Sequence, residues 1–212
     1  MKRYEYVLLD WDGNLAKTLD MWLKACRVPL VNRGFNLSDE EIAASFGALK
    51  TYFDMWGITD HDEYIREMDE AAAEMLPYVE LYPDALEVLE ALKSKGIKTA
   101  LITTSPHQNI AHVLERYNMN RLFDVLVTHY DTVNHKPHPE PLEKALAELG
   151  GTKELAIMVG DTDKDLGAAA NFGIDSMLFY PSEHKKFYPL EKLKEHNPTY
   201  VFDDFRKLLE LV

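Results

Sequence analysis

The sequence predicts an α/β fold in which a parallel sheet carries helices on both faces and an all-helical segment follows the first strand. Two observations favour this class. From residue 82 onward, short apolar runs alternate with amphipathic helical patterns, which is typical of parallel strands joined by crossover helices. Between residues 15 and 81, no strand pattern occurs and Ala, Glu, Met and Leu are frequent.

The first predicted strand is the apolar run Val7–Leu9, which ends at two aspartates one residue apart. Asp10 and Asp12 point to the same side because strand side chains alternate with period 2. Such a pair repels itself unless a cation or a shared proton relieves it. Gly13 permits a sharp turn or a close approach to a ligand. By itself the pattern is equally typical of a polar turn, so the rest of the chain decides.

The segment after this strand is predicted to be an inserted helical domain. A capping box, Ser38 to Glu41, opens its second helix, and Pro77 ends its last. The predicted helices span residues 16–31, 38–46, 49–56 and 61–76. The expected domains are residues 1–14 with 82–212, and residues 15–81.

The remaining chain alternates between the two kinds of element. We expect strands over residues 97–103, 124–128, 155–159, 176–180 and 199–202. We expect helices over residues 83–95, 105–118, 139–149, 163–172 and 205–211. No low-complexity tract or long-period repeat interrupts this order.

Composition restricts the partners. The 212 residues are 46% hydrophobic and 28% charged, as in ordinary globular proteins. The net charge of −13 disfavours nucleic acid and anionic membranes. Cys26 is the only cysteine, which excludes an intramolecular disulfide, fits a reducing compartment and suits a small buried hydrophobe. Without a signal-peptide pattern or a bilayer-spanning run, we expect a cytoplasmic protein.

Polar residues gather at the carboxyl ends of the predicted strands. In an open parallel sheet this edge binds ligands, so segments far apart in the sequence are predicted to converge on one crevice. The residues concerned are Asp10, Asp12, Thr103, Thr104, Lys136, Asp161 and Asp165.

These residue types suit phosphoryl chemistry. The aspartates supply the hard oxygen ligands that Mg²⁺ prefers. Lys136 adds a positive charge and Thr103 adds a hydroxyl, which together with a metal form a receptor for a phosphoryl group. One carboxylate could attack phosphorus to give an aspartyl-phosphate, while its neighbour moves protons.

The motifs resemble those of the haloacid dehalogenase (HAD) superfamily, in the branch of phosphoglycolate phosphatase-like enzymes and beta-phosphoglucomutase. The resemblance covers nearly the whole chain and implies a Rossmann-like core with a helical cap, residues 15–81, that closes over the site. The four motifs, in family order, are Asp10-Trp11-Asp12-Gly13-Asn14-Leu15, Leu101-Ile102-Thr103-Thr104-Ser105, His135-Lys136-Pro137-His138-Pro139-Glu140-Pro141 and Val159-Gly160-Asp161-Thr162-Asp163-Lys164-Asp165.

The resemblance also implies roles. Asp10 would be the nucleophile and a metal ligand, and Asp12 the general acid/base and a ligand through its backbone carbonyl. Thr103 would donate to phosphate, and Lys136 would stabilise charge. The remaining Mg²⁺ ligands would be Asp161, directly, and Asp165, directly or through water.

Two residues depart from the family pattern, and two are candidate substrate contacts. Asn14 stands where Thr or Val is usual, and Lys17 where phosphatases of this branch usually carry an acidic residue. Both lie at the expected hinge between core and cap. Lys50, in the stretch Gly47-Ala48-Leu49-Lys50, and Thr104 are the candidate substrate contacts.

Other polar and aromatic groups have simpler interpretations. The histidines 129, 135 and 138 lack zinc-ligand partners and spacing, and are expected to be loop residues. The aromatic and methionine side chains of residues 52, 53, 55 and 56 are expected in the core of the cap. Residues His184-Lys185-Lys186 are expected in a solvated loop.

The leading functional hypothesis is a Mg²⁺-dependent phosphatase of a small phosphorylated metabolite. A sugar-phosphate mutase shares the same residues and stays open. A non-catalytic module on the same fold is the third alternative, disfavoured because it would not need Asp10, Asp12, Lys136 and Asp161 together. The resemblance makes a dehalogenase or a phosphonatase less expected, because those enzymes lack the second carboxylate. Substrate and oligomeric state are not predicted.

Overall fold

The computed structural model describes residues 3–46 and 49–212. Its centre is a six-stranded sheet in the order β3-β2-β1-β4-β5-β6, with every neighbouring pair parallel. The strands are β1 (Tyr6–Leu9), β2 (Lys98–Ile102), β3 (Val125–Val127), β4 (Ala156–Gly160), β5 (Asp175–Phe179) and β6 (Tyr200–Phe202). The predicted α/β class and all six predicted strands are confirmed.

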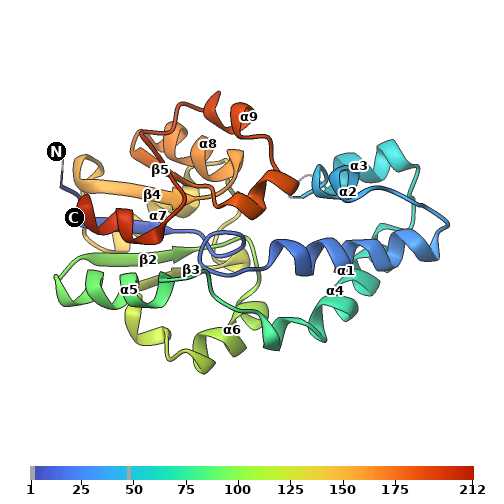
Figure 1. The fold of residues 1–212 in the computed structure, drawn as a ribbon, viewed down its shortest axis with the longest axis horizontal. Coiled ribbons are helices and arrows are strands. Elements are labelled where there is room, and N and C mark those ends of the chain that lie inside the picture. The colour runs from blue at the N-terminus through green and yellow to red at the C-terminus, as the bar shows by residue number, and fades with distance from the viewer. Residues whose placement is uncertain (1–2, 47–48) are drawn as a thin grey trace.

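Helices cover both faces of the sheet (Figure 1). Along β1, Val7 and Leu9 pack into one apolar cluster and Leu8 into the other, as the period of a strand requires. The first cluster contains residues of α5 (Ala85–Ser94) and α6 (His107–Arg116), and the second contains residues of α7 (Glu140–Glu148) and α8 (Asp163–Phe172).

Most helix boundaries fall within about one turn of their predicted positions. Near the carboxyl-terminal end of the chain, short α9 (Leu190–Lys194) and η5 (Ser182–Lys186) were not predicted. The predicted last helix is the 3-10 helix η6 (Phe205–Glu210). The other 3-10 turns are η1 (Leu76–Tyr78), η2 (Asn120–Leu122), η3 (His129–Asp131) and η4 (Lys153–Leu155).

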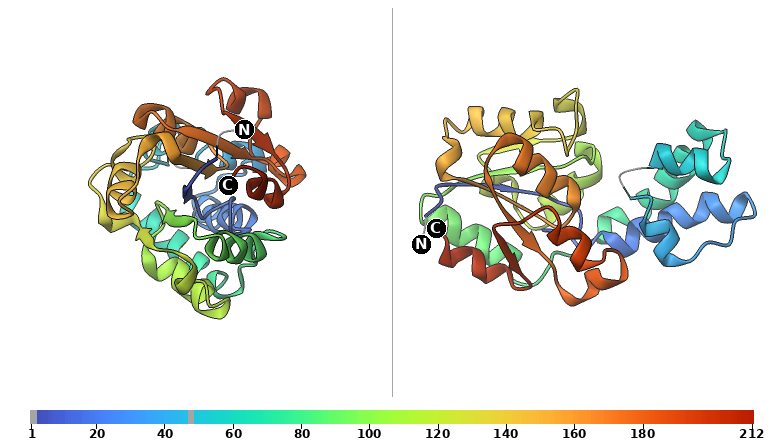
Figure 2. Two further views of the ribbon diagram at one scale, coloured as in Figure 1. Left: turned by 90° about the vertical axis from the view of Figure 1, so that its left-hand side faces the viewer. Right: turned by 90° about the horizontal axis from the view of Figure 1, so that it is seen from above.

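Four helices between residues 19 and 73 form a group beside the carboxyl end of the sheet (Figures 1 and 2). They are α1 (Leu19–Asn32), α2 (Asp39–Ala43), α3 (Leu49–Trp56) and α4 (His61–Ala73). The Ser38–Glu41 capping box that begins α2 is confirmed. An apolar cluster that includes Cys26, Phe53 and Tyr64 of these helices, and also Phe187 from the sheet-bearing part of the chain, holds them together.

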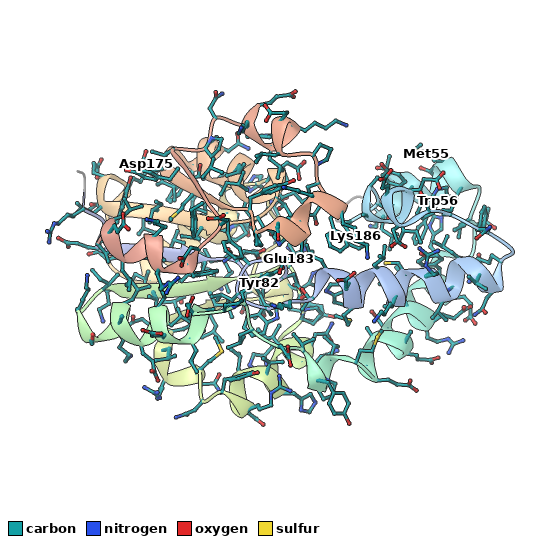
Figure 3. The ribbon with its side chains drawn as sticks, in the orientation of Figure 1. Met55, Trp56, Tyr82, Asp175, Glu183 and Lys186 are labelled. Atoms are coloured by element: carbon teal, nitrogen blue, oxygen red, sulfur yellow. The ribbon has the colours of Figure 1, made fainter. Side chains whose placement is uncertain are left out.

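One residue of this group contradicts the sequence interpretation. Phe53 is fully buried and Trp56 packs partly against the same cluster, but Met55 is 70% exposed. Figure 3 shows Met55 at the outer side of the helices. In an α-helix, side chains two positions apart point to nearly opposite sides, so Phe53 and Met55 cannot both reach the same core.

Two chain segments run side by side between the sheet and the helical group. Ala16 and Leu81 form an antiparallel bridge. The Lys17 amide donates to the Glu80 carbonyl at 2.8 Å, and the Tyr82 amide donates to the Leu15 carbonyl at 2.9 Å. Among the described helices, none is both long and apolar enough to cross a bilayer.

Candidate active site

The site lies where β1, β2 and β4 end. Asp10, Thr103 and Asp161 each follow one of these strands directly, and parallel pairing brings their ends to one edge. Gly13 adopts a φ of 72°, and a Cβ there would stand 2.3 Å from Asp161 Oδ2. Only glycine allows the loop after β1 to approach Asp161 this closely.

Lys136 joins two of the aspartates. Its buried Nζ donates to Asp10 Oδ1 and to Asp165 Oδ1, each at 2.6 Å, and to the Ile102 carbonyl at 3.1 Å. Asp165 is fixed from its other side, because its Oδ2 accepts from the Thr162 hydroxyl at 2.7 Å in a capping box that begins α8. The lysine charge is therefore held against Asp10 by a second, anchored carboxylate.

The carboxylates outnumber the cations. One oxygen from each of Asp10, Asp161 and Asp165 lies within 4.8 Å of the other two. Burial, and then the charge of Asp165, raises the pKa of Asp10 to about 7, although Lys136 opposes the shift. Burial also raises the pKa of Asp161 well above its usual range.

The donor set fits a divalent cation. Both oxygens of the Asp161 carboxylate are buried and accept no hydrogen bond within the described residues. A buried carboxylate without a partner is costly, and a hard cation would satisfy it. The structure thus brings together the three residues predicted to bind the cation through their side chains.

The carboxylate of Asp12, whose predicted metal contact is its backbone carbonyl, has other partners. Its Oδ1 accepts from Trp22 Nε1 at 2.8 Å, and its Oδ2 accepts from the Ser105 hydroxyl at 2.7 Å. The Thr103 hydroxyl lies 3.5 Å from the same Oδ2 and accepts from the Ser105 amide at 3.0 Å. Ser105 and Trp22 are site residues that sequence reasoning did not identify.

A cavity of about 1200 Å³ opens above these groups, toward the helical group. It is lined by Asp10, Asp12 and Lys136, and also by the exposed candidates Thr104 and Lys50. Lys164, also at its wall, donates to the Phe46 carbonyl at 3.2 Å. The candidate loop residues Gly47 and Ala48 lie outside the described part of the chain.

The two departures from the family pattern have distinct surroundings. Asn14 is fully buried, and its amide nitrogen donates to the Asp10 carbonyl at 3.0 Å and to the Val159 carbonyl at 3.3 Å. It ties the loop that carries Asp10 to β4. Lys17 is exposed, with its Nζ 5.5 Å from the centre of the Tyr82 ring.

The interpretation of residues 184–186 as a solvated loop is wrong for His184. This histidine is fully buried, with Nε2 2.8 Å from the Tyr82 hydroxyl and Nδ1 3.9 Å from Asp161 Oδ2. Lys185 and Lys186 are exposed, and Lys186 pairs with Asp20 at 2.7 Å. Figure 3 shows Lys186 beside the helical group. The polar residues of this stretch gave no indication that the side chain of His184 points into the protein.

Comparison with known proteins supports the same family. The model of the haloacid dehalogenase-like hydrolases matches residues 7–179. Pyrophosphatase PpaX of Bacillus cereus strain B4264 is 34% identical, with 99% of this chain and 97% of the relative covered. A protein of Caldanaerobacter subterraneus, provisionally named pyrophosphatase PpaX, is 32% identical, with 97% and 93% covered.

Solved structures share the fold. A provisionally named phosphoglycolate phosphatase from Lactobacillus plantarum has a TM-score of 0.86 at 22% identity, covering 99% of this chain and 100% of its own. CbbY from Rhodobacter sphaeroides, solved in complex with xylulose-1,5-bisphosphate, has a TM-score of 0.80 at 20% identity, covering 95% of each chain. This chain belongs to the haloacid dehalogenase-like hydrolases and is a phosphatase.

Proposed function

We propose that the protein hydrolyses a small phosphomonoester through an aspartyl-phosphate on Asp10, with Mg²⁺ as its cofactor. The observation that carries the proposal is the contact of Lys136 Nζ with Asp10 Oδ1 at 2.6 Å, beside an Asp161 carboxylate that has no hydrogen-bond partner among the described residues. The lysine favours the anionic, nucleophilic form of a carboxylate that burial would otherwise protonate.

Each residue then has a defined task. A carboxylate oxygen of Asp10 bonds to phosphorus while the bond from phosphorus to the leaving oxygen breaks, and Asp12 gives that oxygen its proton. Asp12 next removes a proton from water, whose oxygen attacks phosphorus and restores Asp10. Lys136 and Thr103 stabilise the charge of the transferring group.

Asp10, Asp161 and Asp165, with the backbone carbonyl of Asp12, would hold the cation. When bound, Mg²⁺ would neutralise negative charge on the phosphoryl group and so lower the barrier to attack by an anion. Oxygen-only ligands favour Mg²⁺ over the metals that prefer nitrogen or sulfur.

We also propose that residues 15–81 are a cap over a core formed by residues 1–14 and 82–212. The support is the apolar cluster that joins the four helices to one another, the paired segments at Ala16 and Leu81, and the cavity between the two parts. A cap of this kind would exclude bulk water during phosphoryl transfer.

The substrate is proposed to be anionic beyond its reacting phosphoryl group. Lys50 and Lys164 line the cavity, and neither forms an ion pair with a carboxylate in the described residues. Two relatives are named for pyrophosphate and phosphoglycolate, and a third was solved with a bisphosphate. Each of these compounds carries a second anionic group. Pyrophosphate, a phosphoanhydride that presents the same kind of reacting phosphoryl group, is therefore assayed first, beside the phosphomonoesters.

A substrate panel tests the proposal. Pyrophosphate, phosphoglycolate, sugar phosphates, nucleoside monophosphates and an aryl phosphate are incubated with and without Mg²⁺, and both free phosphate and isomerised sugar phosphate are measured. We expect Mg²⁺-dependent phosphate release, whereas an isomerised product without phosphate release would indicate a mutase. Borohydride added during turnover should reduce an acyl phosphate at residue 10 to homoserine, detectable by peptide mass spectrometry.

Asp10→Asn should abolish both phosphate release and labelling. Asp203→Asn, an exposed carboxylate change on the same sheet-bearing part of the chain, is the matched control. Turnover by Asp10→Asn at a substantial fraction of the parent rate would remove Asp10 from its proposed role.

A further inference from the structure

His184 is a buried polar side chain that the proposed chemistry does not use. It lies in η5, after β5, and none of its surface is exposed. The rings of Tyr82, Phe179, Tyr180 and Tyr188 surround it at centroid distances of 5.7, 5.9, 5.9 and 6.3 Å. A polar group in such an apolar enclosure is costly unless its polar atoms have hydrogen-bond partners.

The two ring nitrogens have different neighbours. Nε2 is 2.8 Å from the Tyr82 hydroxyl. Nδ1 has no hydrogen-bond partner among the described residues and lies 3.9 Å from Asp161 Oδ2, which is also without one. Two buried polar atoms without partners therefore face each other, and one of them belongs to the strongest candidate ligand of the cation.

The surroundings identify the tautomer. The enclosing aromatic rings favour an uncharged imidazole, which has a single N–H. Asp161 is an acceptor, which places that proton on Nδ1. The Tyr82 hydroxyl can both donate and accept, so it donates to Nε2.

We propose that His184 is a positioning residue for Asp161, whose Nδ1–H restrains one carboxylate oxygen and leaves the other free for a divalent cation, while Tyr82 fixes the tautomer. The inference rests on the proposed metal site. Groups that orient a ligand contribute to metal affinity without touching the metal. Figure 3 shows Tyr82 near the middle of the molecule, close to Glu183, the neighbour of His184.

Tyr82 extends the same chain of contacts to the crossing between sheet and helices. Its amide donates to the Leu15 carbonyl at 2.9 Å, next to the bridge between Ala16 and Leu81. The order of contacts is therefore the crossing segment, Tyr82, His184 and Asp161. A change at Tyr82 should reach the cation only through the histidine.

Substitutions with amide side chains test the roles of the two ring nitrogens of His184 one at a time. His184→Asn places an amide nitrogen near the position of Nδ1 and keeps a donor toward Asp161. His184→Gln places its amide near Nε2 and keeps only the contact with Tyr82. The probe is Mn²⁺, whose binding to the substrate-free protein is followed by electron paramagnetic resonance, with Mg²⁺ as competitor.

We expect His184→Asn to bind Mn²⁺ within about threefold of the parent and His184→Gln about 10–100-fold more weakly, which is the usual effect of losing a group that orients a ligand. Tyr82→Phe should weaken binding, and this loss should vanish in the His184→Gln background. Equal binding by the parent and a folded His184→Gln, or equal losses in both amide variants, would overturn the proposal.

The proposal can still be tested in two other cases. If His184→Gln does not fold, as judged by circular dichroism, Tyr82→Phe decides, and unchanged Mn²⁺ affinity there contradicts the proposal. If the parent binds Mn²⁺ but hydrolyses no phosphoester, the proposed function fails while the binding series still tests His184.

Discussion

The indole Nε1 of Trp22 donates a 2.8 Å hydrogen bond to Asp12 Oδ1. Trp22 belongs to α1 in the helical group, whereas Asp12 follows β1 in the sheet. The second oxygen of Asp12 accepts from the Ser105 hydroxyl, which comes from the segment after β2. The proposed acid/base is thus held between the two parts of the protein.

Trp22→Phe should lower kcat about tenfold and leave KM within about twofold. Phenylalanine keeps an aromatic ring at this position but has no indole N–H, so the change removes the hydrogen bond that orients Asp12, and misorientation of a catalytic group costs rate more than binding. Steady-state kinetics with an aryl phosphate measure both constants. Trp56→Phe, the same change in α3, is the control, and an equal fall in kcat there would remove the special role of Trp22.

Lys136→Met should destabilise the metal-free protein by about 3–5 kcal/mol, because two buried carboxylates lose their cation. Mg²⁺ should reduce the difference in unfolding free energy between the parent and Lys136→Met. It would compensate the charges of the same carboxylates and stabilise the folded state, which binds it. Urea unfolding in EDTA and in Mg²⁺ measures the free energy of unfolding. A difference that Mg²⁺ does not change would contradict the assignment of the cation to this cluster, and exposed Lys185→Met should change neither value.

The strand ends account for what the sequence could predict about the site. Apolar runs locate the strands, and parallel pairing then obliges Asp10, Thr103 and Asp161 to lie at one edge, because each directly follows a strand. The longer helices could be predicted from their hydrophobic periodicity and their capping residues alone. The shortest helices were not predicted because a helix of one or two turns is too short to show a periodic pattern.

The residues that were missed depend on side-chain direction. Ser105 was placed at a helix start, but its hydroxyl turns back to Asp12. Trp22 has ordinary helical spacing, and its contact depends on how α1 meets the sheet. His184 lies in a polar stretch whose inward turn is decided by packing against Tyr82. Strong local polarity did not predict exposure because tertiary contacts determine it.

Lys164→Gln should raise KM about tenfold for substrates with a second anionic group and change it less than twofold for an aryl phosphate. Lys164 lines the cavity, and its Nζ donates to the neutral Phe46 carbonyl, so its charge is available to a ligand. Such a charge attracts a second anion strongly only where solvent is partly excluded. Equal changes for both substrates would remove this role, and exposed Lys24→Gln on α1 is the control.

Cys26 should resist alkylation in the folded protein. Burial, with a smaller contribution from the charge of Asp69, raises the pKa of its thiol to about 12, and only 5% of the residue is exposed. At pH 8.5 the thiolate fraction should be roughly a thousandfold below that of a free cysteine. Labelling by iodoacetamide, with and without urea, measures the protection.

The same shift predicts how stability changes with pH. The native thiol holds its proton above pH 9, where an unfolded thiol releases it, so the contribution is complete below pH 9 and is lost as the pH rises toward 12. Between pH 8 and pH 10, the parent should lose about 1.4 kcal/mol of unfolding free energy relative to Cys26→Ala. Parallel pH profiles for the two proteins, or rapid labelling of the native thiol, would show that the sulfur is not held in the apolar cluster with Phe53 and Tyr64.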